Sequence, residues 1–112
     1  MAPLKLGPLP YDEISPKMRE VAQDLIYNDI WERPELSKRD RSLLTVASLV
    51  TTYRNDQLRT HLGRALDNGV TREEIGEALL HLAFYAGFPN ATQAFHIAKE
   101  VFERRDAQGK GQ

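Results

Sequence analysis

The sequence predicts an all-α fold. Apolar residues recur every three or four positions along most of the chain, and no stretch alternates with the two-residue period of a strand. Signals for helix starts and stops divide this pattern into five or six segments. The 112 residues have the length of one domain, and none of them is cysteine. Thiol catalysis, disulfides and cysteine-ligated zinc are therefore excluded.

The chain begins with a segment that cannot form a regular helix. Residues 1–14 contain three prolines, so we predict an extended arm that is either flexible or wrapped around a neighbouring subunit. Ser15 and Pro16 have the types expected at an N-cap and a first helical turn. Helical spacing then gives the first helix an apolar stripe, composed of Met18, Val21, Ala22, Leu25 and Ile26. Pro34 ends this segment.

Two further helices are predicted in the middle of the chain. The first covers about residues 37–53 and opens with a capping box in which Ser37 precedes Asp40 by three positions. It is apolar on most faces, which predicts burial on more than one side. The next helix is capped by Asn55 or Asp56, and Asn68 with Gly69 supplies its left-handed stop.

A fourth helix is predicted from the capping box of Thr71 and Glu74 to Gly87. Its second half, residues 79–86, is apolar on every side except at one histidine, and we expect another subunit to cover part of it.

Asn90 and Gln93 can cap a fifth helix. Its predicted buried stripe is Ala91, Ala94, Phe95, Ala98, Val101 and Phe102. The helical domain thus covers residues 15–107, and residues 108–112 form a polar tail that we expect to be flexible.

Composition restricts the possible partners. The formal net charge of -1 offers no general attraction to nucleic acid. The longest apolar run, residues 78–88, is too short for a bilayer span of about 20 residues. Prolines stand where a signal peptide has an uninterrupted apolar core. We therefore expect a cytoplasmic protein that binds neither nucleic acid nor membrane.

Polar side chains on apolar helical faces are the candidate functional residues. Glu77, His81 and Tyr85 recur every four positions in the fourth helix and so share one strip. His61 also faces inward, on the third helix. Each histidine is either a functional group or a structural core residue, which for His81 means a hydrogen bond to Glu77 or to a backbone carbonyl. No spacing typical of a metal site occurs, so no metal is expected.

Two more residues have both a structural and a functional interpretation. Arg54 stands at the junction of the second and third helices, either as an ordinary surface arginine or as a clamp for a carboxylate ligand. Trp31 either lines a pocket or seals the core.

Four segments together resemble a known family. They are RSLLTVA at 41–47, HLGRALDNGVTREEI at 61–75, EALLHLAFYAGFP at 77–89 and AKEVF at 98–102. In order and spacing they are similar to the carboxymuconolactone decarboxylase family. The resemblance implies the alkylhydroperoxidase D-like helical fold and a homo-oligomer, commonly a trimer or hexamer. In the hydroperoxidase branch of that family, a Cys-x-x-Cys-x-x-x-His motif falls on Arg54, Gln57 and His61. Only the histidine is kept, so the chain resembles the decarboxylase branch.

The resemblance implies a function for the candidate residues. That function is cofactor-free decarboxylation of a carboxylated lactone, such as 4-carboxymuconolactone, in the degradation of aromatic compounds. Arg54 would hold a substrate carboxylate, with Gln57 and Trp31 beside the substrate. His61 or His81 would be the general acid or oxyanion donor.

Glu77 would then orient His81, and Tyr85 would be a second donor. Two departures from the family pattern, Tyr53 in place of a common glycine and the run at residues 89–93, suggest a changed substrate. The alternative is a non-catalytic oligomeric protein that binds a small molecule.

Overall fold

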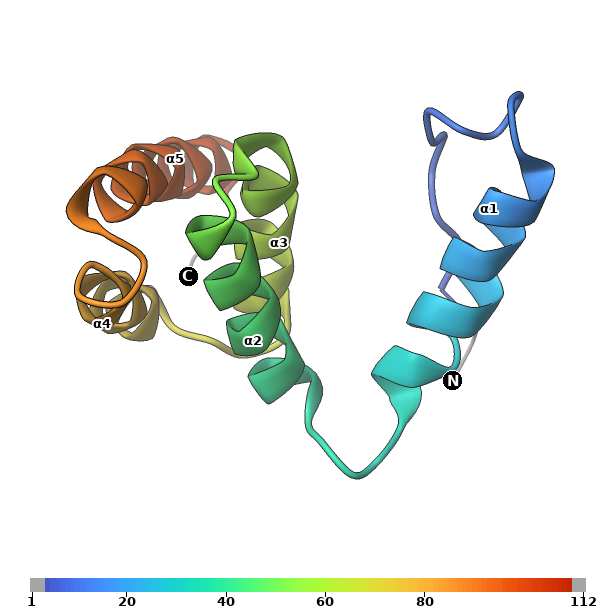
Figure 1. Cartoon of the computed structure of the whole chain (residues 1–112), viewed down its shortest axis with the longest axis horizontal. Helices are drawn as coiled ribbons and strands as arrows, with labels where there is room; N and C mark the ends of the chain where they lie inside the picture. The colour runs from blue at the N-terminus through green and yellow to red at the C-terminus, as the bar shows by residue number, and fades with distance from the viewer. Residues whose placement is uncertain (1–3, 110–112) are drawn as a thin grey trace. The chain divides into compact units, whose positions relative to one another are not determined.

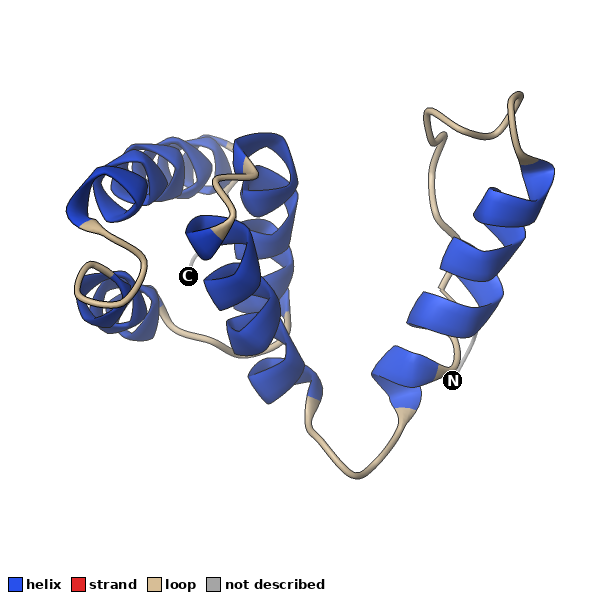
Figure 2. Cartoon of the chain, in the orientation of Figure 1, coloured by secondary structure: helices blue, strands red, loops and turns tan. Residues whose placement is uncertain are grey.

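A computed structural model describes residues 4–109 of the chain. Helices and connecting turns make up this range, with no strand among its residues, so the predicted all-α class is confirmed (Figure 2). The chain divides into two compact units, Met1–Lys38 and Arg39–Gln112. Figure 1 labels the main helices of each unit. Residues 1–3 of the predicted arm and residues 110–112 of the predicted tail lie outside the described range.

The first helix of the N-terminal unit starts where the sequence predicts. In α1 (Pro16–Glu20), the Ser15 hydroxyl accepts a hydrogen bond from the backbone amide of Met18 at 3.2 Å. The helix then widens into a π-helical stretch, η1 (Val21–Tyr27), and a short 3-10 turn follows, η2 (Ile30–Glu32). The prediction of a plain amphipathic α-helix over this segment is therefore wrong in detail.

Contacts with the arm give a physical reason for the wide turn. In a π-helix a backbone amide donates to the carbonyl five positions earlier, as the amide of Asn28 does to the carbonyl of Gln23 at 3.2 Å. Both side chains consequently reach the arm. Asn28 Oδ1 accepts from the amide of Leu4 at 2.7 Å, and Gln23 Oε1 accepts from the amide of Leu6 at 2.9 Å.

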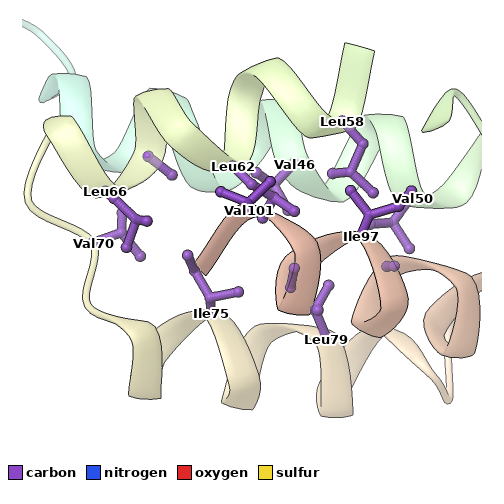
Figure 3. Packing of buried hydrophobic residues seen from close by; sticks show 13 residues of the cluster. Val46, Val50, Leu58, Leu62, Leu66, Val70, Ile75, Leu79, Ile97 and Val101 are labelled. Carbon is purple, nitrogen blue, oxygen red and sulfur yellow. The ribbon is translucent and has the colours of Figure 1, made fainter. Parts of the chain in front are cut away.

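The C-terminal unit contains α2 (Lys38–Thr51), α3 (Asn55–Asp67), α4 (Arg72–Leu82) and α5 (Phe88–Ala107). Figure 3 shows their apolar side chains meeting in one core. Helix α3 contributes Leu58, Leu62 and Leu66, and α5 contributes Ile97 and Val101. The labelled cluster is completed by Val46 and Val50 of α2, Val70 of the turn between α3 and α4, and Ile75 and Leu79 of α4. The residues of α3 that face the core therefore recur at helical spacing, as one apolar stripe.

Local capping signals are confirmed around the turn between α3 and α4. Gly69 has φ 98°, the left-handed conformation expected after a helix. Thr71 and Glu74 form the predicted capping box, because each side chain accepts from the other's backbone amide at 3.0 Å.

The predicted end of the fourth helix, Gly87, is wrong. Helix α4 ends at Leu82, and tight turns follow in which the amide of Tyr85 donates to the carbonyl of Leu82 at 3.1 Å. Gly87 itself has φ 103° and is the N-cap of α5. Pro89 in the first turn of α5 has no amide proton to donate, which suits a helix start. A left-handed glycine followed by proline therefore starts the next helix.

Two other predicted caps are wrong. Arg54, not Asn55 or Asp56, is the N-cap of α3, and its side chain makes no capping hydrogen bond. Because α5 already begins at Phe88, Asn90 lies inside its first turn and donates instead to backbone carbonyls of α2.

The predicted stripe of α5 also needs one change. Phe95 is 44% exposed, and Ile97 takes its place in the core. In residues 4–109, no helix has both the length and the apolar character needed to cross a membrane.

Candidate functional site

The most coherent group of predicted site residues lies on α3. Gln57, His61 and Arg64 follow one another at spacings of three or four positions, so they share one face of the helix. Arg54, the N-cap, precedes Gln57 by three positions and stands at the start of this strip. This face borders the buried stripe that includes Leu58 and Leu62. The strip therefore has a graded environment. Arg54 and Gln57 are exposed at its N-terminal end, and His61 and Arg64 are half-buried.

The imidazole of His61 sits at the edge of the hydrophobic core. Its Nδ1 atom is shielded from solvent, as is Nη1 of Arg64. Burial lowers the pKa of His61 from 6.5 to about 4, and the positive charge of Arg64 adds to this effect. At neutral pH His61 is consequently an uncharged imidazole with one N–H to donate and one nitrogen to accept.

Arg64 is a part of this strip that the sequence analysis does not single out. Its position three residues after His61 was the available signal, because that spacing places two side chains on the same helical face. The positive charge of Arg64 lowers the pKa of His61.

Arg54 carries an unneutralised positive charge at the start of the strip. Within residues 4–109 its guanidinium has no acidic partner. The acidic side chain close by, Asp56, pairs with Arg59 at 3.3 Å, and Arg59 also binds Glu100. A cation that is exposed and unpaired is suited to binding a carboxylate from solution.

The backbone around Arg54 is closely held. Its amide donates to the carbonyl of Leu49 at 2.9 Å, and its carbonyl accepts from the amide of Leu58 at 2.9 Å. Tyr53 just before it has φ 59°, a left-handed conformation that is unusual for a residue other than glycine. This is the position at which the resemblance described above implies a glycine.

A second group of predicted residues lies at the end of α4. The rings of His81 and Tyr85 are stacked, with centroids 4.8 Å apart and an interplanar angle of 27°. Both side chains are exposed in the single chain, which corrects the expectation of a buried His81. His81 lies inside α4 on the face opposite the buried Ile75 and Leu79, whereas Tyr85 lies in a turn after the helix has ended.

Glu77 is exposed one turn before His81. The hydrogen bonds found within the described range do not include one between Glu77 and His81, so orientation of His81 by Glu77 stays a prediction.

Trp31 belongs to the N-terminal unit, where its ring stacks on Tyr27 with centroids 5.9 Å apart. The structure therefore places the predicted residues in a strip along α3 and in a ring pair at the end of α4. The role of Trp31 stays a prediction. A pocket of about 450 Å³ also lies in the N-terminal unit. The pocket is lined by Lys5, Leu6, Arg19, Gln23, Asp24 and Asn28. None of these is a predicted site residue.

The described residues therefore form an all-helical protein in which a neutral histidine, His61, lies on α3 and an unpaired cation, Arg54, lies at the start of that helix. Residues 12–100 match the sequence profile of the carboxymuconolactone decarboxylase family. The chain belongs to this family, and the predicted resemblance is confirmed.

Three relatives are informative. Over 77 residues, 69% of this chain, it is 44% identical to a 4-carboxymuconolactone decarboxylase of Acinetobacter baylyi, 58% of which is covered. Over 94 residues, 84% of this chain, it is 33% identical to a nitrosuccinic acid decarboxylase of Metarhizium robertsii, 64% of which is covered. An uncharacterised 15.0 kDa protein of Paracoccus denitrificans is 26% identical over 87 residues, 76% of this chain. The chain spans 58% to 65% of the length of these relatives.

Proposed function

We propose that this protein is a cofactor-free decarboxylase of a small carboxylated lactone, with 4-carboxymuconolactone as the first substrate to test. The proposal places it in the degradation of aromatic compounds. Two relatives named as decarboxylases support the reaction class. The observation that carries the proposal is the strip on α3, where the unpaired Arg54 stands at the start of the face that carries the neutral His61.

In the proposed mechanism Arg54 holds a substrate carboxylate by charge-assisted hydrogen bonds. The bond between the lactone ring and its departing carboxylate breaks, and the electron pair moves into the unsaturated lactone as a dienolate. CO2 is released as this bond breaks, and a proton added to carbon then completes the enol-lactone product. Because the substrate itself accepts the electron pair, the proposal includes no metal or organic cofactor.

The lowered pKa decides which role suits His61. With a pKa of about 4, only about one His61 in a thousand is protonated at pH 7. A neutral imidazole is better suited to donating a hydrogen bond to the developing dienolate oxygen than to supplying the proton. We therefore assign stabilisation of the oxyanion to His61 and delivery of the proton to His81. Glu77 orients His81, and Tyr85 is a second donor. Gln57 would add a neutral contact to the substrate.

The test is turnover of 4-carboxymuconolactone, with nitrosuccinate as the second substrate, followed by CO2 release. We expect Arg54→Ala mainly to raise KM and His61→Ala mainly to lower kcat. Each substitution is expected to lower kcat/KM by about 10- to 100-fold. The His96→Ala variant is the control, because His96 is exposed on α5 outside both groups. Near wild-type rates for Arg54→Ala, His61→Ala and His81→Ala, all correctly assembled, would rule out this site. Binding without CO2 release would favour the non-catalytic alternative.

We also propose that the chain acts as a homo-oligomer, a trimer or hexamer, in the cytoplasm. Large apolar side chains between the end of α4 and the first half of α5 support an oligomer, because monomers rarely expose such a patch. They are Leu80 at 50%, Phe84 at 69%, Phe88 at 61% and Phe95 at 44% exposure. Light scattering after size exclusion measures the subunit number, and a monomer at micromolar concentration would contradict the proposal.

A further inference from the structure

The junction between α2 and α3 determines where Arg54 lies. After Thr51 the chain turns through Tyr53, whose amide donates to the carbonyl of Val50 at 3.2 Å. The amide of Arg54 reaches one residue further back, to Leu49. This pair of hydrogen bonds is the usual closure of a helix by a left-handed residue, a position where glycine is preferred. With tyrosine at φ 59°, the surrounding structure must stabilise a conformation that the local sequence disfavours.

A side chain from a distant part of the chain contacts this junction. Asn90 lies in the first turn of α5 and is half-buried. Its Nδ2 atom donates to the carbonyl of Val50 at 3.0 Å and to the carbonyl of Thr51 at 3.2 Å. Carbonyls in the last turn of a helix lack partners within that helix. The Val50 carbonyl also accepts from the amide of Tyr53, so Asn90 is its second donor. The start of α5 is therefore joined to the end of α2 by one amide group.

We propose that Asn90 is a positioning residue for Arg54. The two carbonyls that it binds lie three and four residues before Arg54, on the segment whose conformation sets the direction of the Arg54 backbone. Loss of the Asn90 amide removes the link between α2 and α5 and lets the strained turn relax, which moves the guanidinium relative to His61. This inference rests on the proposed function, in which Arg54 holds a substrate carboxylate.

A double-mutant cycle on kcat/KM for 4-carboxymuconolactone tests the inference. Asn90→Ala is expected to lower kcat/KM by about 3- to 10-fold, mainly through KM, because a misplaced binding group weakens substrate orientation. In the Arg54→Ala background the same substitution is expected to change kcat/KM by less than about 1.5-fold, because its effect passes through Arg54. A merely structural role would lower kcat/KM in both backgrounds. Equal effects in both, or no effect in either, overturn the inference.

Two further variants separate positioning from stability. Asn90→Asp keeps the shape of the side chain but cannot donate to the two carbonyls. Its charge is favourable at the N-terminus of α5 but is repelled by the carbonyl oxygens at the end of α2. It is expected to fold with an unfolding temperature somewhat below that of wild type and to show at least the kinetic loss of Asn90→Ala. Asn90→Gln retains the amide and is expected to recover part of the activity. Thr92→Ala, an exposed change in the same turn, is the control. An Asn90→Asp variant with wild-type kcat/KM overturns the inference even if Asn90→Ala fails to fold.

Hydrogen exchange provides a readout that does not depend on turnover. The backbone amides of Tyr53 and Arg54 are expected to exchange at least several-fold faster in Asn90→Ala, while amides in the middle of α5 keep their rates. Unchanged exchange at the junction overturns the inference whatever the substrate is. A fully active Arg54→Ala variant, by contrast, contradicts the proposed function while the exchange result still decides whether Asn90 holds the junction.

Discussion

Acidification is expected to destabilise the folded protein through His61. Burial lowers the pKa of its imidazole from 6.5 to about 4, with the charge of Arg64 as the second cause. In the unfolded chain the imidazole regains its ordinary pKa. Between about pH 6.5 and pH 4 the unfolded state therefore binds more protons than the folded state. The contribution of neutral His61 to the free energy of unfolding is therefore fully present above pH 6.5, and it is lost as the pH falls from 6.5 to about 4.

The size of the effect follows from the same values. The difference between 6.5 and about 4, multiplied by about 1.4 kcal/mol per pH unit, gives an upper limit of about 3 kcal/mol. His61 is only half-buried, and solvent screening reduces this figure. We therefore expect the His61 contribution to the free energy of unfolding to fall by about 1–2 kcal/mol between pH 7.5 and pH 4.5.

Urea denaturation of wild type and His61→Gln at both pH values, at one fixed protein concentration, measures this contribution. A fixed concentration is needed because association also changes apparent stability. The pH-dependent loss in wild type should exceed that in His61→Gln by about 1–2 kcal/mol. His96→Gln is the matched control, since it removes an exposed histidine and leaves His61 in place. If wild type and His61→Gln lose the same stability, the interpretation of His61 as a buried neutral imidazole is wrong.

Three other substitutions test the fold. Tyr53→Gly should raise the free energy of unfolding by about 0.5–1 kcal/mol, because φ 59° costs glycine nothing. Thermal unfolding beside Tyr53→Ala, which keeps a Cβ atom, checks this, and a lower Tm for glycine would contradict it. Thr71→Ala should cost about 1 kcal/mol through loss of the capping box, whereas Thr71→Ser should keep most of it. Leu62→Ala should cost about 2–5 kcal/mol, because Leu62 is 0% exposed; a urea midpoint like that of wild type would refute the packing.

The two groups of candidate site residues, the strip on α3 and the ring pair of His81 and Tyr85, differ in how far the sequence predicts them. The strip on α3 could be predicted in large part, because fixed helical spacing places Gln57 and His61 on one face wherever that helix packs. The ring pair at the end of α4 could be predicted only in part. His81 lies on the outward face of α4, whereas Tyr85 leaves the helical periodicity because the helix ends at Leu82.

By itself, the sequence determined the features that depend on neighbours in the chain. The absence of cysteine, the helical periodicity and the capping box at Thr71 are local properties, and each can be assessed from a few adjacent residues. Only the tertiary structure decided that residues 21–27 form a π-helical turn, because the side chains of Gln23 and Asn28 bind the arm. Only the tertiary structure decided the role of Asn90 as well. The two carbonyls that Asn90 binds lie 40 and 39 residues away in the chain. A hydrogen bond over such a separation leaves no periodic pattern in the sequence, because it forms only when α2 and α5 pack together.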